Sequence, residues 1–202
     1  MRAISLVVCV ATEVEGALLR PHVPVVVTGV GAVNAAYSLT RFLCREQVEA
    51  ILVCGIGGAY PGSGISVGSI VCAESECYGD LGASSPGGFL DMEALGFSVI
   101  PGVYNVLPMQ IFPVAERARF VTMNTCTGTD DDARAIEART RGAVESMEGA
   151  AIAHVAALAE IPVGEIRGIS NLVGNRDRSA WRVKEAATAA QEVLLEWIRH
   201  TI

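Results

Sequence analysis

Short apolar runs rich in Val and Ile alternate along this chain with stretches that have the periodicity of a helix. The pattern predicts strands at residues 3–10, 24–28, 50–54, 67–74, 119–123 and 163–169, and helices at residues 32–46, 130–141, 148–160 and 179–200. Such alternation is typical of α/β proteins. We therefore expect one domain over residues 1–202, with three α/β/α layers and a central mixed, largely parallel sheet. Residues 79–98, rich in Gly, Ser and Pro, are expected to form a mobile loop.

The composition excludes several classes of protein. Of the 202 residues, 51% are hydrophobic, which excludes an intrinsically disordered chain. The net charge is −7 and the 15 basic residues are scattered, so neither nucleic acid nor a membrane surface is an expected partner. No apolar run reaches the roughly 18 residues that a transmembrane helix needs. The excess of hydrophobic residues predicts a parallel sheet covered on both faces, a subunit interface, or both.

The cysteines and histidines indicate neither a disulfide framework nor a metal site. The six cysteines show no C-x-x-C spacing, and several lie inside apolar runs. The apolar start of the chain ends without a small-residue cleavage site, so we expect a cytoplasmic protein. The three histidines are far apart and lack the spacing of metal ligands, so we expect no metal and no other cofactor.

Two glycine patterns resemble known motifs but lack the required context. Residues 29–31 give the first two glycines of a dinucleotide fingerprint without the third, so an NAD site is not expected. The backbone N–H groups of this turn remain candidates for binding an anion or a ribose oxygen. Residues 64–68 match G-x-S-x-G, but a strand follows the motif where a nucleophile elbow needs a helix.

Two glutamates are candidates for chemistry, and each also has a structural interpretation. Thr12 and Glu15 have the spacing of a helix capping box, but Glu15 also follows the first strand, where it could deprotonate a water. Glu148 precedes a helix and could simply stabilise its dipole. Because that helix is almost wholly apolar, Glu148 needs partners, and two vicinal sugar hydroxyls would supply two donors.

Polar residues after the last strand are further candidates. Asn171 is either a turn residue or a ligand-binding amide, and Trp181 is either a core residue or the wall of an aromatic pocket. The acidic run at residues 130–132 predicts a helix N-terminus and a solvated face.

Five motifs, taken in order, resemble those of the purine nucleoside phosphorylase and methylthioadenosine nucleosidase superfamily. They are Thr12–Glu15, Thr28–Gly31, Cys54–Gly58, Met147–Val155 and Arg167–Asn171. The resemblance extends from about residue 3 to residue 198. Within the superfamily, residues 170–177 together with Trp181 are most similar to the futalosine hydrolases, which release hypoxanthine from futalosine in an alternative route to menaquinone.

The resemblance implies roles for individual residues, a purine nucleoside as substrate, and a homodimer or larger homo-oligomer. It gives Glu15 the activation of the attacking water, Glu148 the ribose hydroxyls, and Asn171 a contact with N7 of the purine. The other site residues that it implies are Arg167 near the water, Met147 under the sugar, Trp181 and Gly57 near the substrate, and Thr125, Cys126 and Thr127 at the base pocket.

Three departures from the superfamily's patterns affect the expected chemistry. Asn171 replaces the Asp of the adenine-specific nucleosidases, and its amide donors suit a 6-oxopurine such as hypoxanthine. Glu13 and Glu15 stand where phosphorylases bind phosphate, which favours water as the nucleophile. Ile56 replaces a Ser that helps to hold that water. The alternatives are a methylthioadenosine/S-adenosylhomocysteine nucleosidase, a purine nucleoside phosphorylase, and a catalytically silent purine-binding protein.

The expected substrate also carries a benzoate at its far end, and an arginine should bind that anion. Arg176 and Arg178 are the candidates within this chain, and a partner subunit is the alternative source.

Overall fold

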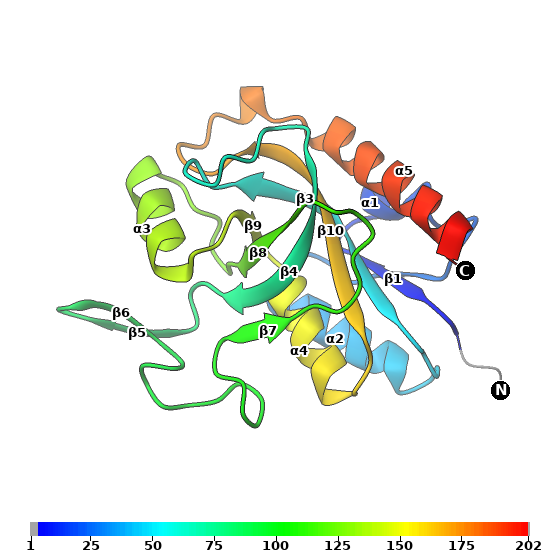
Figure 1. Cartoon of the computed structure of the whole chain (residues 1–202), viewed down its shortest axis with the longest axis horizontal. Coiled ribbons are helices and arrows are strands. Elements are labelled where there is room, and N and C mark those ends of the chain that lie inside the picture. The colour runs from blue at the N-terminus through cyan, green and yellow to red at the C-terminus, as the bar shows by residue number, and fades with distance from the viewer. Residues whose placement is uncertain (1–3, 202) are drawn as a thin grey trace.

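One mixed sheet of eight strands organises the protein in this computed structural model, which describes residues 4–201 (Figure 1). Its strands are β1 (Val7–Val10), β2 (Val25–Val27), β3 (Ile51–Ala59), β4 (Ile70–Tyr78), β7 (Val106–Pro108), β8 (Arg117–Thr122), β9 (Val144–Ser146) and β10 (Val163–Leu172). The helices are α1 (Glu13–Gly16), α2 (Ala32–Leu43), α3 (Asp130–Thr140), α4 (Gly149–Leu158) and α5 (Val183–Thr201), with a 3-10 turn at Arg178–Ala180. No helix among the described residues is long and apolar enough to span a membrane.

The sheet closes on itself around β10. The strand order is β10-β4-β8-β9-β3-β1-β2, and β10 also pairs with β3, so β3, β10, β4, β8 and β9 form a ring. Pairing is parallel for β1 with β2 and β3 and for β10 with β3, but antiparallel for β10 with β4 and β3 with β9. The predicted α/β class and mixed sheet are confirmed. The architecture is more closed than the three flat layers that were expected. The reason is that β10, at the end of the strand order, pairs back with β3 as well as with β4.

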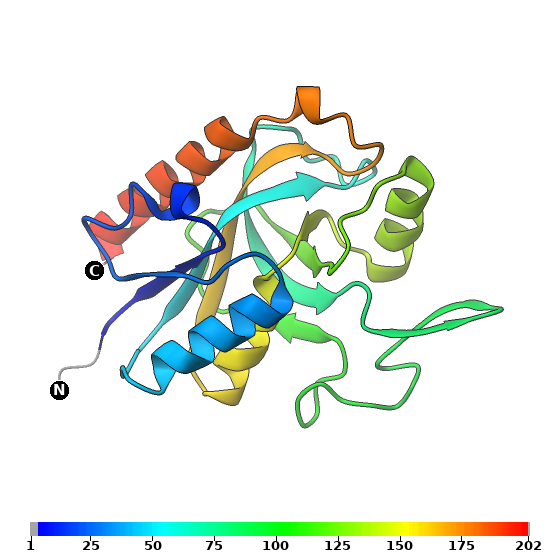
Figure 2. The ribbon, with the colours of Figure 1, turned by 180° about the vertical axis from the view of Figure 1, so that it is seen from behind.

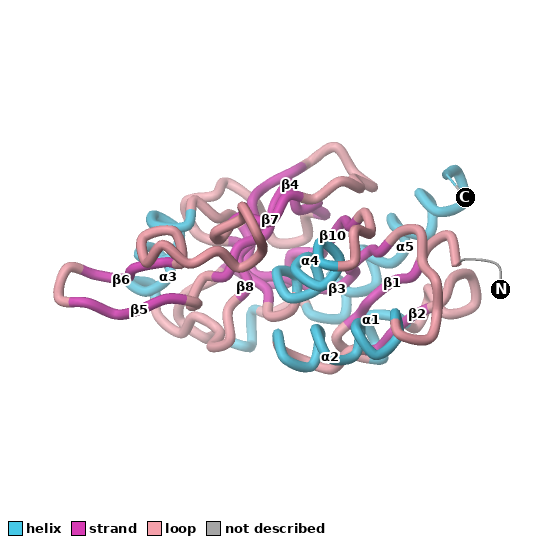
Figure 3. The backbone as a smooth tube through the Cα atoms, turned by 90° about the horizontal axis from the view of Figure 1, so that it is seen from below, coloured by secondary structure: helices cyan, strands magenta, loops and turns pink. Residues whose placement is uncertain are grey.

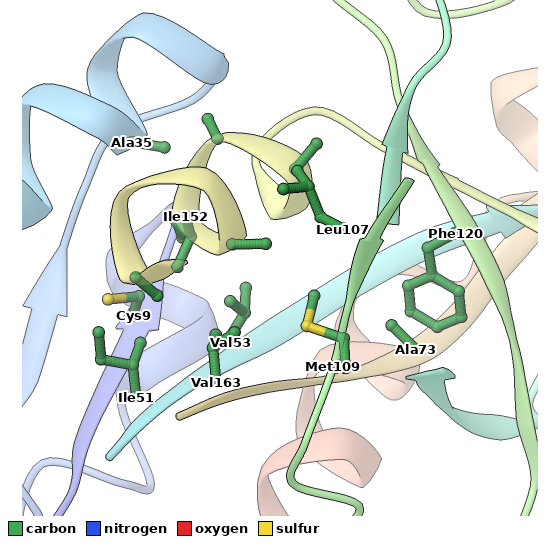
Figure 4. Packing of buried hydrophobic residues seen from close by; sticks show 14 of the residues in the cluster. Cys9, Ala35, Ile51, Val53, Ala73, Leu107, Met109, Phe120, Ile152 and Val163 are labelled. Carbon is green, nitrogen blue, oxygen red and sulfur yellow. The ribbon is translucent and has the colours of Figure 1, made fainter. Parts of the chain in front are cut away.

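Helices cover the sheet on two sides. Figure 2 shows α2 and α4 next to each other on one side, and α1 with the long α5 on the other. In the core on the α4 side, Ile51 and Val53 of β3 lie in one cluster with Ile152 of α4 (Figure 4). On the other side, Leu52 of β3 lies in a cluster with Leu194 of α5. Neighbouring residues of β3 therefore serve opposite faces, and burial of each such side chain contributes about 1.5–3 kcal/mol.

Two predicted segments differ from the structure. Residues 79–98, predicted as a loop, contain the hairpin β5 (Gly82–Ser85) and β6 (Gly88–Asp91), which projects from the body of the protein (Figure 3). The second is β3, which continues to Ala59 through three glycines. These positions need glycine because a side chain there would collide with neighbouring residues. A Cβ on Gly57 would lie 2.7 Å from Cγ1 of Val144. The short β7 and β9 have no separate signal in the sequence.

The parallel pairing of β1, β3 and β10 brings their carboxyl ends to one edge of the sheet. Three parts of the chain therefore meet there: residues 11–15, which follow β1, residues 55–59, which end β3, and residues 170–177, which include the end of β10 and the segment after it. In α/β folds this is the edge at which ligands bind.

Candidate active site

A cavity of about 480 Å³ lies at the carboxyl ends of β1, β3 and β10. Nine of the ten residues that the sequence predicts for the site line it: Glu15, Gly57, Cys126, Thr127, Met147, Glu148, Arg167, Asn171 and Trp181. They come from six separate parts of the chain, so only the fold brings them together. The volume is in the range typical of small-molecule sites.

Thr125, the tenth predicted residue, does not line the cavity. The loop is fastened on both sides of it: Asn124 donates to Asp80 from its backbone N–H (2.8 Å) and its amide (2.9 Å), and the Thr127 N–H donates to Glu145 (2.9 Å). Thr125 is consequently turned to solvent, whereas Sγ of Cys126 lies 3.3 Å from Sδ of Met147 at the cavity wall. The sequence could not show this placement of Thr125, because these ties depend on tertiary contacts.

Glu15 caps α1 and also faces the cavity. Its Oε2 accepts from the backbone N–H (2.9 Å) and the hydroxyl (2.8 Å) of Thr12, which is the capping interaction. Its Oε1 accepts from the backbone N–H of Ile56 (3.1 Å). A backbone donor thus orients the carboxylate of Glu15. A Cβ on Gly55 would lie 2.7 Å from this Oε1, so a larger residue at position 55 would displace Glu15.

Glu13 does not share the cavity with Glu15. Its side chain is 72% exposed and forms an ion pair with Arg20. The sequence argument that two carboxylates at this position repel phosphate therefore applies to only one of them, because a helix of this kind turns residues 13 and 15 to different sides.

Glu148 lies at the N-terminus of α4 and is almost fully buried. Its Oε1 accepts from the backbone N–H of Gly31 (3.0 Å), and its Oε2 accepts from Nη2 of Arg167 (3.4 Å). The expectation that the Gly29–Gly31 turn offers its N–H groups to a ligand was therefore wrong for Gly31, because Glu148 uses that donor. Each carboxylate oxygen still has a lone pair that can accept from a substrate hydroxyl.

Arg167 is buried beneath the cavity and connects its carboxylates. Nε donates to Oε1 of Glu165 (2.6 Å), and Nη1 donates to the carbonyl of Ile56 (3.1 Å). Burial alone would lower the pKa of Arg167, but Glu165, Glu148 and Glu15 together raise it, so the guanidinium stays charged. Its charge offsets the cost of burying the glutamates around it.

The amide of Asn171 has a defined orientation. The Ser170 hydroxyl donates to Oδ1 (2.7 Å), and Nδ2 donates to the carbonyl of Leu172 (2.9 Å). This arrangement occupies the acceptor side of the amide and leaves one N–H of Nδ2 for a further acceptor. Asn171 can therefore donate to a ligand in the cavity.

Two cations line the cavity near Trp181. They are Arg176, whose Cζ lies 5.3 Å from the centroid of the Trp181 ring, and Lys184, the single lysine of the chain. Arg178, the other candidate for binding the benzoate, approaches the ring to 6.0 Å but is not among the lining residues. Lys184 could not be identified from the sequence as a lining residue, because its place depends on how the start of α5 packs.

Glu145 is a further lining residue that the sequence did not reveal. Its carboxylate accepts from the Tyr60 hydroxyl (2.8 Å) and from the backbone N–H of Thr127 (2.9 Å), and the Thr127 hydroxyl is a third donor. The burial of Glu145 in the three-residue β9 explains why no periodicity marks it. Within residues 4–201, no group of three His, Cys, Asp or Glu side chains is arranged to hold a metal ion.

Comparison with known proteins identifies relatives of this chain. The phosphorylase superfamily matches residues 12–201. Futalosine hydrolase of Thermus thermophilus is 34% identical over 174 residues, covering 80% of this chain and 75% of the relative. Those of Acidothermus cellulolyticus (38%, 80% and 69% covered) and Streptomyces coelicolor (35%, 82% and 74% covered) are similarly close.

Solved structures share the fold at lower sequence identity. A 5′-methylthioadenosine/S-adenosylhomocysteine nucleosidase from Colwellia psychrerythraea, in complex with adenine, has a TM-score of 0.81 at 21% identity, with 98% of this chain and 96% of that chain covered. An S-adenosylhomocysteine nucleosidase from Streptococcus pyogenes has a TM-score of 0.84 at 19% identity, with 100% and 99% covered. These structures support the nucleosidase-like architecture of the chain.

Proposed function

The chain belongs to the futalosine hydrolases of the phosphorylase superfamily, and we propose that it hydrolyses the N-glycosidic bond of futalosine to release hypoxanthine for the futalosine route to menaquinone. The observation that carries the proposal is the placement of Glu15, Glu148 and Asn171 around one cavity, each oriented by its own partners. These groups supply a base for water, an acceptor for sugar hydroxyls and a donor for the departing purine.

In the proposed reaction, the bond between C1′ and N9 stretches until the ribosyl group is positively charged and the purine negatively charged. Asn171 donates from Nδ2 towards N7, and one well-placed donor of this kind contributes about 2.7–4 kcal/mol. Glu148 accepts from the ribose hydroxyls and fixes the sugar. Glu15 takes the proton of the water that adds to C1′, and the departing purine anion takes up a proton from solvent to leave as neutral hypoxanthine. Met147 lies under the sugar, Gly57 and Trp181 lie near the substrate, and Cys126 and Thr127 line the base pocket.

The charge distribution of the cavity favours water over phosphate. A phosphate beside C1′ would approach the carboxylate of Glu15, and like charges repel. The buried cation nearby, Arg167, already binds Glu165, Glu148 and the Ile56 carbonyl. A phosphorylase would need a cation free to hold the nucleophile, whereas a hydrolase needs only a base.

The alternative is a methylthioadenosine/S-adenosylhomocysteine nucleosidase, which the shared fold favours. Asn171 argues for the main proposal, because its remaining N–H can donate to an acceptor of a 6-oxopurine, whereas a protonated Asp, which donates to N7 and accepts from the 6-amino group, suits adenine better. A direct comparison incubates the protein with futalosine, methylthioadenosine and inosine and identifies the released base. Hypoxanthine from futalosine at the highest kcat/KM supports the proposal, and preferred release of adenine overturns it.

Replacing Asn171 by Asp tests the contact with the base. We expect Asn171→Asp to lower kcat for futalosine by about 100-fold or more, because an ionised carboxylate cannot donate to N7. The ratio of kcat/KM for methylthioadenosine to that for futalosine should rise. The check is the steady-state rate of base release from both substrates. An unchanged ratio would show that residue 171 does not select the base.

Replacing Arg176 tests the site for the substrate's carboxylate. We expect Arg176→Ala to raise KM for futalosine by about 10- to 100-fold, because a hydrogen bond to a charged group contributes about 1.5–3 kcal/mol. Hydrolysis of inosine, which lacks the benzoate, should change little. Arg178→Ala is the matched control, since Arg178 does not line the cavity. Equal effects of both variants on both substrates would contradict this assignment.

We also propose that the protein acts in the cytoplasm as a homodimer or larger homo-oligomer. Four exposed apolar side chains support an interface beside the cavity: Val14 and Val30 line its mouth, and Val33 and Tyr37 continue along α2. Val33 is 81% exposed, and exposed apolar side chains that gather in one patch mark a surface for contact with another protein. Light scattering on the purified protein measures the assembly directly, and a monomer at working concentration would contradict it.

A further inference from the structure

Two carboxyl groups lie behind Arg167, on the side away from the cavity. Glu76 of β4 and Glu165 of β10 are both fully buried. Both approach the N-terminus of α4, where a Cβ on Gly149 would overlap with Oε1 of Glu76 and Oε2 of Glu165. Two oxygens that converge on the same point must lie close to each other. Glycine at position 149 is what allows this approach.

The two carboxyl groups have different partners. Oε2 of Glu76 accepts from the Thr122 hydroxyl (3.0 Å), and Oε1 accepts weakly from the Ser146 hydroxyl (3.4 Å). Oε1 of Glu165 accepts from Nε of Arg167 (2.6 Å). If both groups were ionised, Oε2 of Glu165 would have no hydrogen-bond donor among the described residues. An orphaned oxygen in a dry interior costs about 1–3 kcal/mol, and more when it is charged.

Charge balance also indicates that one of the two carboxyl groups keeps its proton. Arg167 is the cation that faces this pair, and its charge is already shared with Glu148 and Glu15. Two adjacent carboxylates in a buried site cannot both ionise beside one shared cation, so one retains a proton. Burial raises the pKa of Glu165 as well, but the guanidinium that Glu165 contacts stabilises its anion, whereas Glu76 contacts only hydroxyl groups. Burial raises the pKa of Glu76 well above its usual range, and the neighbouring Glu165 raises it further.

We propose that Glu76 is protonated at neutral pH and donates its proton in a hydrogen bond to Oε2 of Glu165, and that this pair positions Arg167. Arg167 in turn donates to Glu148 and to the carbonyl of Ile56. The N–H of the same residue, Ile56, orients Glu15. Glu76 and Glu165 are therefore positioning residues that act on the cavity through the guanidinium. Only this positioning role rests on the proposed function, since the protonation state of Glu76 can be measured without any substrate.

Infrared spectroscopy tests the protonation state. Carboxyl groups in water are ionised at pH 7, so a buried protonated acid gives a separate carbonyl stretching band. We expect the wild-type protein to show this band at pH 7, and Glu76→Gln to lose it. Glu145→Gln is the matched control and should keep it, because Glu145 is a buried carboxylate with three donors. Absence of the band from the wild type, or its persistence in Glu76→Gln, overturns the proposal.

Kinetics tests the positioning role. Glutamine at position 76 can still donate to Glu165, so Glu76→Gln should restore most of the kcat that Glu76→Leu loses. Glutamine at position 165 removes the anion beside Arg167, so Glu165→Gln should lower kcat by roughly 10- to 100-fold, as expected for a misplaced catalytic group. Circular dichroism confirms that each variant is folded. A kcat near that of the wild type in both Glu76→Gln and Glu165→Gln, or a large loss of kcat in both, contradicts the assignment. If the wild type does not cleave futalosine, the infrared result still decides the protonation state.

Discussion

Glu15→Gln is expected to lower kcat for futalosine by about 10²- to 10⁴-fold, the usual contribution of a general base. The amide of glutamine cannot take a proton from water at C1′. Its oxygen can still accept from Thr12, which keeps the cap of α1, and the side chain fits the same space beside Gly55. KM should therefore change little, and release of hypoxanthine measured by chromatography gives both constants.

Glu13→Gln is the matched control for this experiment. Glu13 lies two residues away on the same helix, but its side chain is exposed and paired with Arg20. Exposed ion pairs contribute about 0–1 kcal/mol, so this variant should keep the wild-type kcat and nearly the same melting temperature. Full turnover by Glu15→Gln would show that Glu15 serves only to cap the helix.

Glu148→Gln is expected to lower kcat/KM for futalosine by about 100-fold, because the sugar loses the charged acceptor that orients it. The amide preserves the size of the side chain and can still accept from the N–H of Gly31. Its NH2 group would then face Nη2 of Arg167, which is also a donor, so the contact with Arg167 is lost and some loss of stability should accompany the loss of activity. Thermal unfolding followed alongside the kinetics separates the two effects.

A substrate lacking a ribose hydroxyl isolates the role of Glu148. The wild type should cleave 2′-deoxyfutalosine much more slowly than futalosine once the intrinsic reactivity of the two is taken into account. In Glu148→Gln that discrimination should largely disappear, since the group that reads the hydroxyl has been changed. Undiminished discrimination in the variant would mean that Glu148 binds something other than the sugar.

Much of the candidate site could be predicted from sequence because its residues follow the carboxyl ends of strands. Glu15, Glu148 and Asn171 each follow or precede a strongly patterned element, and the parallel sheet brings such positions to one edge. The capping interpretation of Glu15 and the functional one are not exclusive, because its two oxygens face different partners. A motif can therefore stabilise a helix and present a functional group at once.

The features that the sequence did not reveal depend on contacts between distant strands. Ring closure relies on the three-residue β9 and on the glycines of β3, and neither has apolar periodicity. Glu76 and Glu165 lie within strands, where a charged residue normally predicts an exposed face. Both are buried because Arg167 and the small Gly149 make room and provide charge for them. Such compensation becomes visible only once the strands are assembled.

Hydrolysis by water beside Glu15 is the central step of the proposed function, and the identity of the sugar product tests it most directly. Futalosine is incubated with the protein with and without inorganic phosphate, and mass spectrometry identifies the released sugar. We predict hypoxanthine and the free sugar in equal amounts, at a rate that phosphate does not change. A sugar 1-phosphate formed in the presence of phosphate, or a reaction that requires phosphate, would contradict the account.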